Sequence, residues 1–193
     1  MLEQAFEAEV TEASSAREAC RLAATAGPDL VILDISLPGA GGLQALEQLL
    51  LQNHAQRVLI FSMHPNPVFA ARALQSGARG YLVKSAPPED LLTAVREVLG
   101  GGTYISQELA KQIALISVYD KADPLNGLSS RELEILSLLG RGNDLAGVAN
   151  ALGLGYKTVA NNITQLKNKL NLRHTAELVR MAVERGIIGT TPK

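Results

Sequence analysis

The stretch Pro28–Gly42, PDLVILDISLPGAGG, decides the fold. Its apolar run Leu30–Leu33 does not alternate with polar residues, which is typical of a strand buried on both faces of a parallel sheet. Asp34 ends the run, and the proline and glycines behind it break the chain. Ligands gather beyond the carboxyl ends of strands in open parallel sheets, so an acid here is more often chemical than structural. The alternative is a loop or capping aspartate.

The chain on both sides of this stretch alternates strands with helices. Further strands are expected at 9–14, 57–64 and 80–84, and helices at 15–24, 43–51, 69–76 and 87–99. The helices are indicated by apolar residues recurring every three or four positions, and by Ser, Pro and Gly at their ends. Regular alternation of this kind predicts an α/β domain with a doubly wound parallel sheet.

Three successive strands of this pattern end in polar residues: Asp34, Ser62 and Lys84. The carboxyl ends of parallel strands lie at one edge of a sheet, so we expect an acid, a hydroxyl and an ammonium in one pocket. A carboxylate can attack phosphorus while the hydroxyl and ammonium stabilise the added oxygens. Each residue also has a plainer interpretation, Ser62 as a strand-end cap and Lys84 as a solvated lysine paired with Asp34.

Residues 9–103 resemble a response-regulator receiver domain, through the motifs Leu-Asp34-Ile-Ser-Leu-Pro-Gly, Phe-Ser62-Met-His and Gly-Tyr81-Leu-Val-Lys84. The resemblance implies that Asp34 is the phosphoacceptor, Ser62 the switch hydroxyl, Tyr81 the switch aromatic and Lys84 the lysine that pairs with phosphate. It also implies Mg²⁺ bound at Asp34 and a histidine kinase as partner. Without the resemblance, Tyr81 is a half-buried core aromatic and His64 a surface residue.

Receivers begin with a strand that ends in two acidic residues, which help to hold Mg²⁺, and this chain starts after that strand. We therefore expect an N-terminally truncated, flavodoxin-like receiver at residues 1–103, with Asp34 in an incomplete magnesium cage. The alternative is a true start that lies upstream of Met1. Attack of a carboxylate on phosphate needs a divalent cation, so Asp34 is not expected to be phosphorylated by the usual route. The absent strand is the central one, so the sheet should close up, or a second copy of the chain should cover its open edge.

The remainder of the chain has a different character. A helix from Ser106 to about Val118 and a polar, turn-rich segment form a connection at residues 104–127. Residues 1–127 carry 14 acidic and 9 basic side chains, whereas residues 128–193 carry 5 acidic and 9 basic ones. The basic C-terminal third therefore favours an anionic partner, although many solvated helical faces are basic too.

Residues 128–193 are expected to be entirely helical. Ser129 and Glu132 have the spacing of a capping box. Helices at 144–152 and 156–170, joined by a short glycine-containing turn, predict a helix-turn-helix. Apolar residues occupy one face of the third helix, and its other face is small, polar and basic without an acid, as a major-groove surface requires. Solvated helix faces usually mix both charge signs. The residues of the polar face are Lys157, Ala160, Asn161, Thr164, Lys167 and Asn168.

This region resembles the LuxR-type helix-turn-helix of NarL/FixJ-class regulators across residues 128–188. The motifs are Leu-Ser-Ser-Arg-Glu-Leu-Glu-Ile-Leu, Lys157-Thr-Val-Ala-Asn-Asn-Ile, and Lys169-Leu followed by Arg173. The resemblance implies double-stranded DNA as partner and a homodimer formed through a fourth helix at 175–185. Asn161 is the candidate for reading a base edge, and Ala160 stands where the family has a contacting lysine, so weaker binding than usual is expected. Candidate phosphate contacts are Lys157, Thr158, Thr164, Lys167 and Lys169.

The sequence as a whole predicts a two-component-type, DNA-binding transcription regulator and not an enzyme. A single cysteine excludes an internal disulfide, and neither a leader peptide nor an apolar run of the roughly 18–20 residues that span a bilayer is visible. These features predict a cytoplasmic protein without a membrane partner. One alternative is an enzyme with Asp34 as nucleophile, for which no general base is recognisable. The other is an interaction module whose helix-turn-helix only dimerises.

Overall fold

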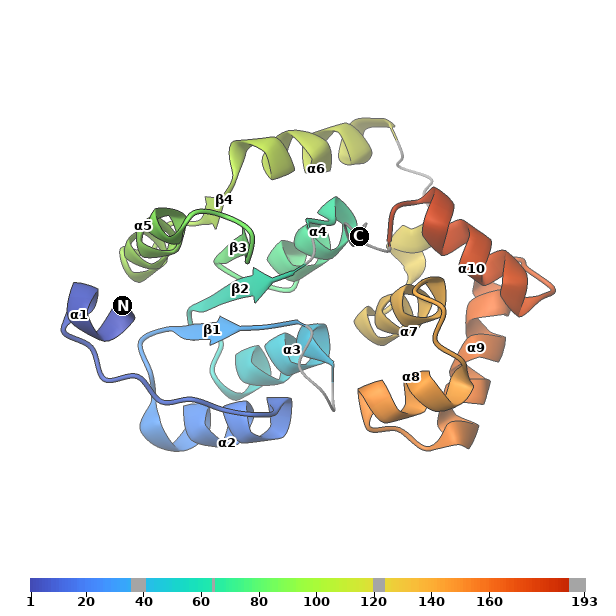
Figure 1. The fold of residues 1–193 in the computed structure, drawn as a ribbon, viewed down its shortest axis with the longest axis horizontal. Helices are drawn as coiled ribbons and strands as arrows, with labels where there is room; N and C mark the ends of the chain where they lie inside the picture. Colours follow the sequence, from blue (N-terminus) through green and yellow to red (C-terminus); the bar gives the residue numbers. More distant parts are fainter. Residues whose placement is uncertain (36–40, 64, 120–123, 188–193) are drawn as a thin grey trace.

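The N-terminal part of the molecule is built on a four-stranded, fully parallel sheet (Figure 1). The computed structural model describes residues 1–35, 41–63, 65–119 and 124–187. The strands lie side by side in chain order, and Ile60 pairs with Tyr81. The sheet confirms the expected α/β architecture. The strands are β1 (Val31–Leu33), β2 (Val58–Ser62), β3 (Gly80–Val83) and β4 (Tyr104–Ile105).

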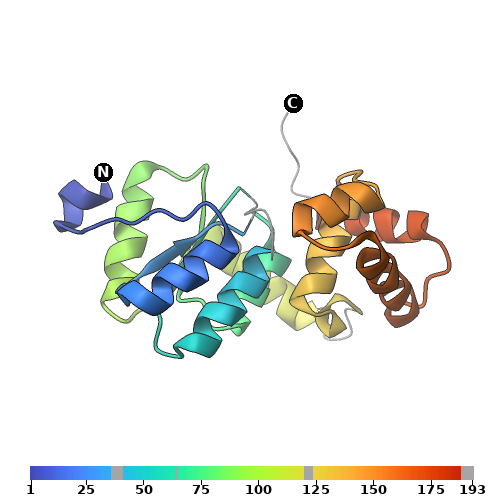
Figure 2. The same ribbon diagram turned by 90° about the horizontal axis from the view of Figure 1, so that it is seen from below.

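Helices cover the sheet on both faces, because successive strand residues point to opposite sides. Val58 and Ile60 of β2 belong to the larger apolar cluster with the helices α2, α3 and α4, whereas Leu59 lies in a second cluster with α5. The helices α2 and α3 run side by side on one face of the sheet (Figure 2). Their bounds are α1 (Leu2–Phe6), α2 (Ala16–Ala26), α3 (Gly42–Gln52), α4 (Pro67–Gln75) and α5 (Pro88–Leu99).

The expected strand at 9–14 is wrong. Residues 8–13 form neither strand nor helix, and Glu9, Val10, Thr11 and Glu12 are exposed. β1 is an edge strand, and among the described residues no other strand lies on its outer side. A strand needs a partner for its backbone groups, and residues 8–13 do not pair with the open edge of β1. The described residues therefore do not close the sheet, and its covering by a second copy stays a prediction.

The C-terminal part is helical, as expected. The capping box of α7 is confirmed, since Ser129 accepts from the Glu132 backbone and the Glu132 carboxylate accepts from the Ser129 N–H at 2.7 Å. Asp144 caps α8 through the backbone N–H of Gly147. The elements are α6 (Gln107–Tyr119), the 3₁₀ turn η1 (Pro124–Gly127), α7 (Ser130–Gly140), α8 (Leu145–Leu152), α9 (Tyr156–Lys169) and α10 (Thr175–Glu184).

The two parts of the molecule meet along an apolar and polar interface. One continuous cluster of buried apolar side chains runs from the sheet into the helices α7 to α10, and α3 packs against α7 (Figure 1). α6 packs against α4. The division of the chain at residues 104–127 stays a prediction. None of the helices in the described ranges is long and apolar enough to cross a membrane.

Candidate functional site

Asp34 and Lys84 meet at the carboxyl ends of β1 and β3. The distance from Lys84 Nζ to Asp34 Oδ2 is 2.7 Å, and the two side chains are 31% and 25% exposed. The Lys84 backbone N–H donates to the Ser62 carbonyl at 2.7 Å and so continues the pairing of β2 with β3. The ammonium lies 5.6 Å from the centroid of the Phe61 ring, within reach of a cation–π contact. Backbone and ring together hold a positive charge against the Asp34 carboxylate.

Tyr81 and Ser62 lie beside this ion pair. Both are buried, at 1% and 0% exposure, and their hydroxyl groups are hydrogen-bonded to each other. Burial, and to a smaller extent the nearby charge of Asp34, raises the pKa of Tyr81 to about 12, so the phenol stays protonated at neutral pH. The four residues expected in the pocket, Asp34, Ser62, Tyr81 and Lys84, are thus together at one edge of the sheet. His64 lies outside the described residues.

The second expected site lies on α9. Val159, Ile163 and Leu166 are buried against the other helices, which leaves the opposite face of the helix toward solvent. The fourteen residues of α9 include no acid. On the open face Lys157, Thr158, Asn161, Thr164 and Lys169 are exposed, and Ala160 and Lys167 are partly exposed.

Two polar side chains of α9 are bonded back to their own helix. Thr164 Oγ1 donates to the Ala160 carbonyl at 3.0 Å, and Asn162 Nδ2 donates to the Thr158 carbonyl at 2.8 Å. The hydroxyl oxygen of Thr164 then remains as an acceptor, whereas its hydrogen is engaged. Asn161 is exposed, and in the described structure no such bond to the helix occupies its side chain.

Comparison with known proteins identifies both parts of the chain. A family model described as a response regulator receiver domain matches residues 1–96, and a model described as bacterial regulatory proteins of the luxR family matches residues 126–182. The transcriptional activator protein ExaE of Pseudomonas putida is 40% identical over 182 residues, which cover 93% of this chain and 85% of that protein. The chain is a response regulator with a LuxR-type DNA-binding domain.

Further relatives agree with this membership. Response regulator UvrY of Escherichia coli K12 is 32% identical over 180 residues, 92% of this chain and 83% of that protein. A LuxR-family two-component response regulator from Aurantimonas sp. SI85-9A1 superposes with a TM-score of 0.55 at 40% identity, covering 57% of this chain and 79% of that one. RcsB of Salmonella enterica serovar Typhimurium, solved bound to a promoter, gives a TM-score of 0.64 at 21% identity over 93% and 87% of the chains. This last likeness supports the fold.

Receiver domains typically bind Mg²⁺ for phosphorylation, and the side chains near Asp34 fit such an ion poorly. Mg²⁺ prefers several oxygen ligands in octahedral geometry. Within the described ranges, no three His, Cys, Asp or Glu side chains are grouped so that they could hold a metal. One carboxylate oxygen of Asp34 is moreover engaged by the Lys84 ammonium at 2.7 Å. Among the residues that the structure describes, Asp34 therefore stands as a single carboxylate ligand at this edge of the sheet.

Lys169, a candidate phosphate contact of the LuxR-type domain, is engaged within that domain. Its Nζ lies 2.8 Å from Glu132 Oε2, although the lysine side chain is 48% exposed. Burial opposes ionisation of Glu132, but hydrogen bonds from Lys169 and from Ser129 outweigh it and lower the pKa of this carboxyl. The bond joins the end of α9 to the start of α7, so Lys169 has a structural partner that competes with phosphate.

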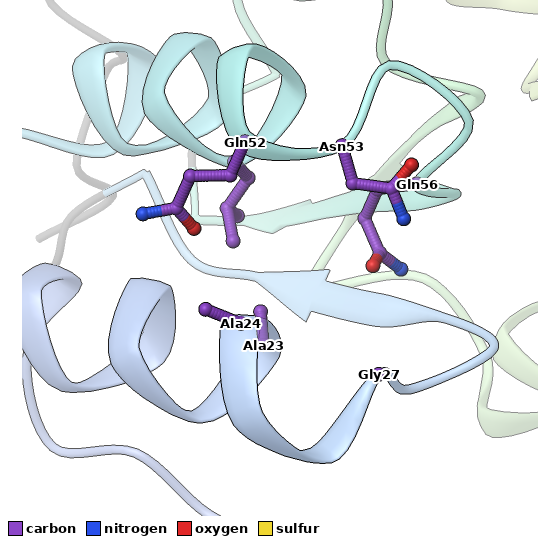
Figure 3. A pocket seen from close by; sticks show the side chains of 7 residues that line it. Ala23, Ala24, Gly27, Gln52, Asn53 and Gln56 are labelled. Carbon is purple, nitrogen blue, oxygen red and sulfur yellow. The ribbon is translucent and has the colours of Figure 1, made fainter.

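A pocket at the opposite edge of the receiver sheet is a weaker candidate (Figure 3). Gln52, Asn53 and Gln56 line it together with small residues of α2, and none of its seven lining residues is charged. Gln56 is 6% exposed, and its amide donates to the Pro28 and Arg57 carbonyls at 2.9 and 3.2 Å. This amide ties together the segments that enter β1 and β2, so its position is explained by the fold.

Sequence reasoning missed three residues at the junction of the receiver and the LuxR-type domain: Gly41, Arg131 and Glu134. Glu134 is 7% exposed, although its place in the sequence is that of an ordinary helix-surface acid. The sequence did contain a signal on α3, the helix that Glu134 contacts. α3 begins after Gly41, without the Ser, Thr, Asp or Asn that usually caps a helix, which indicates that a cap must come from elsewhere.

Proposed function

We propose that this response regulator binds double-stranded DNA through the open face of α9 and thereby regulates transcription. The observation that carries the proposal is a helix of fourteen residues with a buried apolar side and an exposed polar, basic side that lacks any acid. A helix of this character fits the major groove, where its amides and hydroxyls meet base edges and its lysines meet phosphates. This character supports the proposed role as a transcription regulator.

The proposed contacts differ in strength. Asn161 presents both an amide donor and an acceptor and is the candidate for a bidentate contact with adenine. Lys157 and Lys167 are the principal candidates for phosphate contacts, and Thr158 and Thr164 the lesser ones. Lys169 must exchange its bond with Glu132 for a phosphate, so it contributes less. The side chain of Ala160 has no hydrogen-bond donor.

Salt-dependent binding to duplex DNA tests this function. We expect the full chain to bind a mixed-sequence duplex with an affinity that falls steeply with salt. Lys157→Ala should weaken binding and reduce the slope of log K against log salt by about 0.9, because one phosphate contact is lost. Lys111→Ala on α6 removes the same charge away from α9 and is the matched control. Binding without salt dependence, or equal slopes for both variants, would instead favour the interaction module that only dimerises.

Base reading is tested separately, on a site selected from random duplexes. Asn161→Ala should cost about 1–3 kcal/mol on the selected site and far less on mixed-sequence DNA, because only base contacts discriminate. Equal losses of binding free energy on both duplexes would indicate that Asn161 contacts phosphate and not a base edge.

For the receiver we propose that Asp34 is the phosphoacceptor by position, with Ser62, Tyr81 and Lys84 around it, but that the usual Mg²⁺-dependent reaction is slow. Lys84 supplies one positive charge, whereas the approach of a phosphate dianion to a carboxylate needs more compensation than one ammonium gives. A histidine kinase is the proposed phosphodonor partner, and a homodimer through α10, whose Val183 is 51% exposed, the proposed assembly.

A small-molecule phosphodonor tests the receiver directly. Incubation of the chain with acetyl phosphate and Mg²⁺ should label far less than one equivalent, and Asp34→Ala should remove what label there is. A receiver with a complete acidic pair, treated in parallel, shows that the donor is active. Stoichiometric labelling that Asp34→Ala abolishes would contradict the proposal of a slow reaction.

A further inference from the structure

Glu134 of α7 reaches out of the LuxR-type domain to the first turn of α3 in the receiver. Its Oε1 accepts from the backbone N–H of Leu43 at 3.0 Å, a residue 91 positions earlier in the chain. The backbone N–H of Gln44 is a second donor to the same carboxylate. The side chain is 7% exposed, so the contact is made inside the junction of the two domains.

This carboxylate replaces a helix cap that α3 lacks. The first N–H groups of a helix have no partner within the helix, and a side-chain oxygen at the N-cap normally satisfies one of them. Gly41 holds the N-cap position of α3 and has no side chain to do so. Glu134 supplies the oxygen from another domain.

Two consecutive glycines admit this arrangement. Gly41 has a φ of 79°, and a Cβ built on it would lie 2.0 Å from Glu134 Oε2. A Cβ on Gly42 would lie 2.0 Å from the Cα of Ile35, the residue that follows Asp34. The start of α3 is thus packed on one side against the chain leaving the Asp34 pocket and on the other side against Glu134.

Neighbouring polar contacts brace the same junction. Arg131 Nη1 lies 3.4 Å from Glu134 Oε2, and Arg131 Nη2 donates to the side-chain oxygen of Gln44. The Ser130 hydroxyl of α7 donates to the side chain of Glu47, which lies on α3 with Gln44. The start of α7 and the first two turns of α3 are therefore joined by several side-chain contacts. The two helices are neighbours in Figure 1.

We propose that Glu134 is an interdomain latch, which caps α3 from the DNA-binding domain and couples the Asp34 pocket to the position of that domain. The path runs from the Lys84–Asp34 pair through Ile35 to Gly42, then through Leu43 to Glu134. A movement of Ile35 shifts the start of α3 and separates the N–H groups of its first turn from Glu134. The carboxylate must then leave the buried site. The face of α9 is open while the latch is closed, so the latch sets the orientation of the domain rather than covering its DNA-binding surface. Only the consequence for DNA rests on the proposed function.

Amide hydrogen exchange in the full chain at pH 6.5, without DNA, tests the latch. Glu134→Ala should speed exchange at Leu43 and Gln44 about tenfold, since a cap is typically worth about that factor in the equilibrium. Glu134→Gln keeps an acceptor oxygen of the same shape and should stay within about threefold of the unmodified chain. Glu184→Ala, at an exposed acid of α10, is the control. Unchanged exchange in Glu134→Ala overturns the latch. An acceleration in Glu134→Gln or in Glu184→Ala as large as that in Glu134→Ala overturns it too.

The coupling to the pocket needs a second measurement, because closeness in space does not establish coupling. Lys84→Ala should accelerate exchange at Leu43 and Gln44, and this effect should vanish in the Glu134→Ala background. Additive effects of the two substitutions overturn the coupling. If Glu134→Ala does not fold, Gly41→Ala takes its place, since a methyl at that position occupies the site of the carboxylate. Neither readout involves DNA, so a failed latch is distinguishable from a failed DNA-binding proposal.

Discussion

Replacing Leu136 by alanine is expected to lower the free energy of unfolding of the DNA-binding domain by about 2–5 kcal/mol. Leu136 is 0% exposed and lies on α7, the helix against which α8, α9 and α10 all pack. Truncation removes apolar contacts and leaves a cavity where three helices converge, so the surrounding side chains cannot collapse fully into the space. Because α9 is held in place through α7, DNA binding should be lost near the new unfolding midpoint.

Urea unfolding followed by circular dichroism measures this effect. Leu51→Ala on α3, with a side chain that is 74% exposed, is the matched control and should change stability by less than about 0.5 kcal/mol. Where two unfolding transitions are resolved, the urea midpoint of the DNA-binding domain should fall by more than the midpoint of the receiver. Equal losses for Leu136→Ala and Leu51→Ala would mean that α7 is not the centre of the domain.

The parts of the fold that could be predicted are those with strong local patterns. The unbroken apolar run ending at Leu33 gave a parallel strand, and the Ser129–Glu132 spacing gave a helix start. The expected burial on both faces holds only for Leu33, because β1 is an edge strand whose Val31 and Ile32 are partly exposed. The strand expected at 9–14 failed because strand formation depends on a neighbour, which a local pattern does not reveal. β4 was missed for a related reason, since two residues are too few for alternation to be recognised.

The pocket was easier to predict from sequence than the junction. Asp34 and Lys84 both end parallel strands, and topology alone brings such residues to one edge, where the structure puts them 2.7 Å apart. Glu134 and Leu43 belong to different domains and share no periodic pattern, so only the three-dimensional arrangement brings them together. Gly41 at the N-cap of α3 indicates that the helix has no side-chain cap of its own. It does not indicate which residue supplies one.

The junction should respond to pH, and the sign follows from the environment of Glu134. Burial is the largest influence and raises the pKa of its carboxyl from the ordinary 4.5 to about 7, and the charge of Glu47 adds to this. Arg131 and the backbone N–H groups of Leu43 and Gln44 act in the opposite direction without reversing it. The folded chain thus holds a proton at Glu134 between about pH 4.5 and 7 that the unfolded chain has released. This contribution to stability is complete below pH 4.5 and is lost as the pH rises through 7.

Comparison of Glu134→Gln with the unmodified chain isolates this contribution, because other carboxyls such as Glu132, whose pKa is lowered, shift the stability of both proteins alike. The amide stays neutral at every pH, so its advantage over the ionised carboxylate should grow on going from pH 5 to pH 8, by on the order of 2–3 kcal/mol. Urea unfolding at four or five pH values measures the difference. A difference that is flat with pH would show that Glu134 is ionised throughout, held by Arg131 and the start of α3. The same series on Glu184→Gln, at an exposed acid that pairs with Arg180, should be flat and sets the baseline.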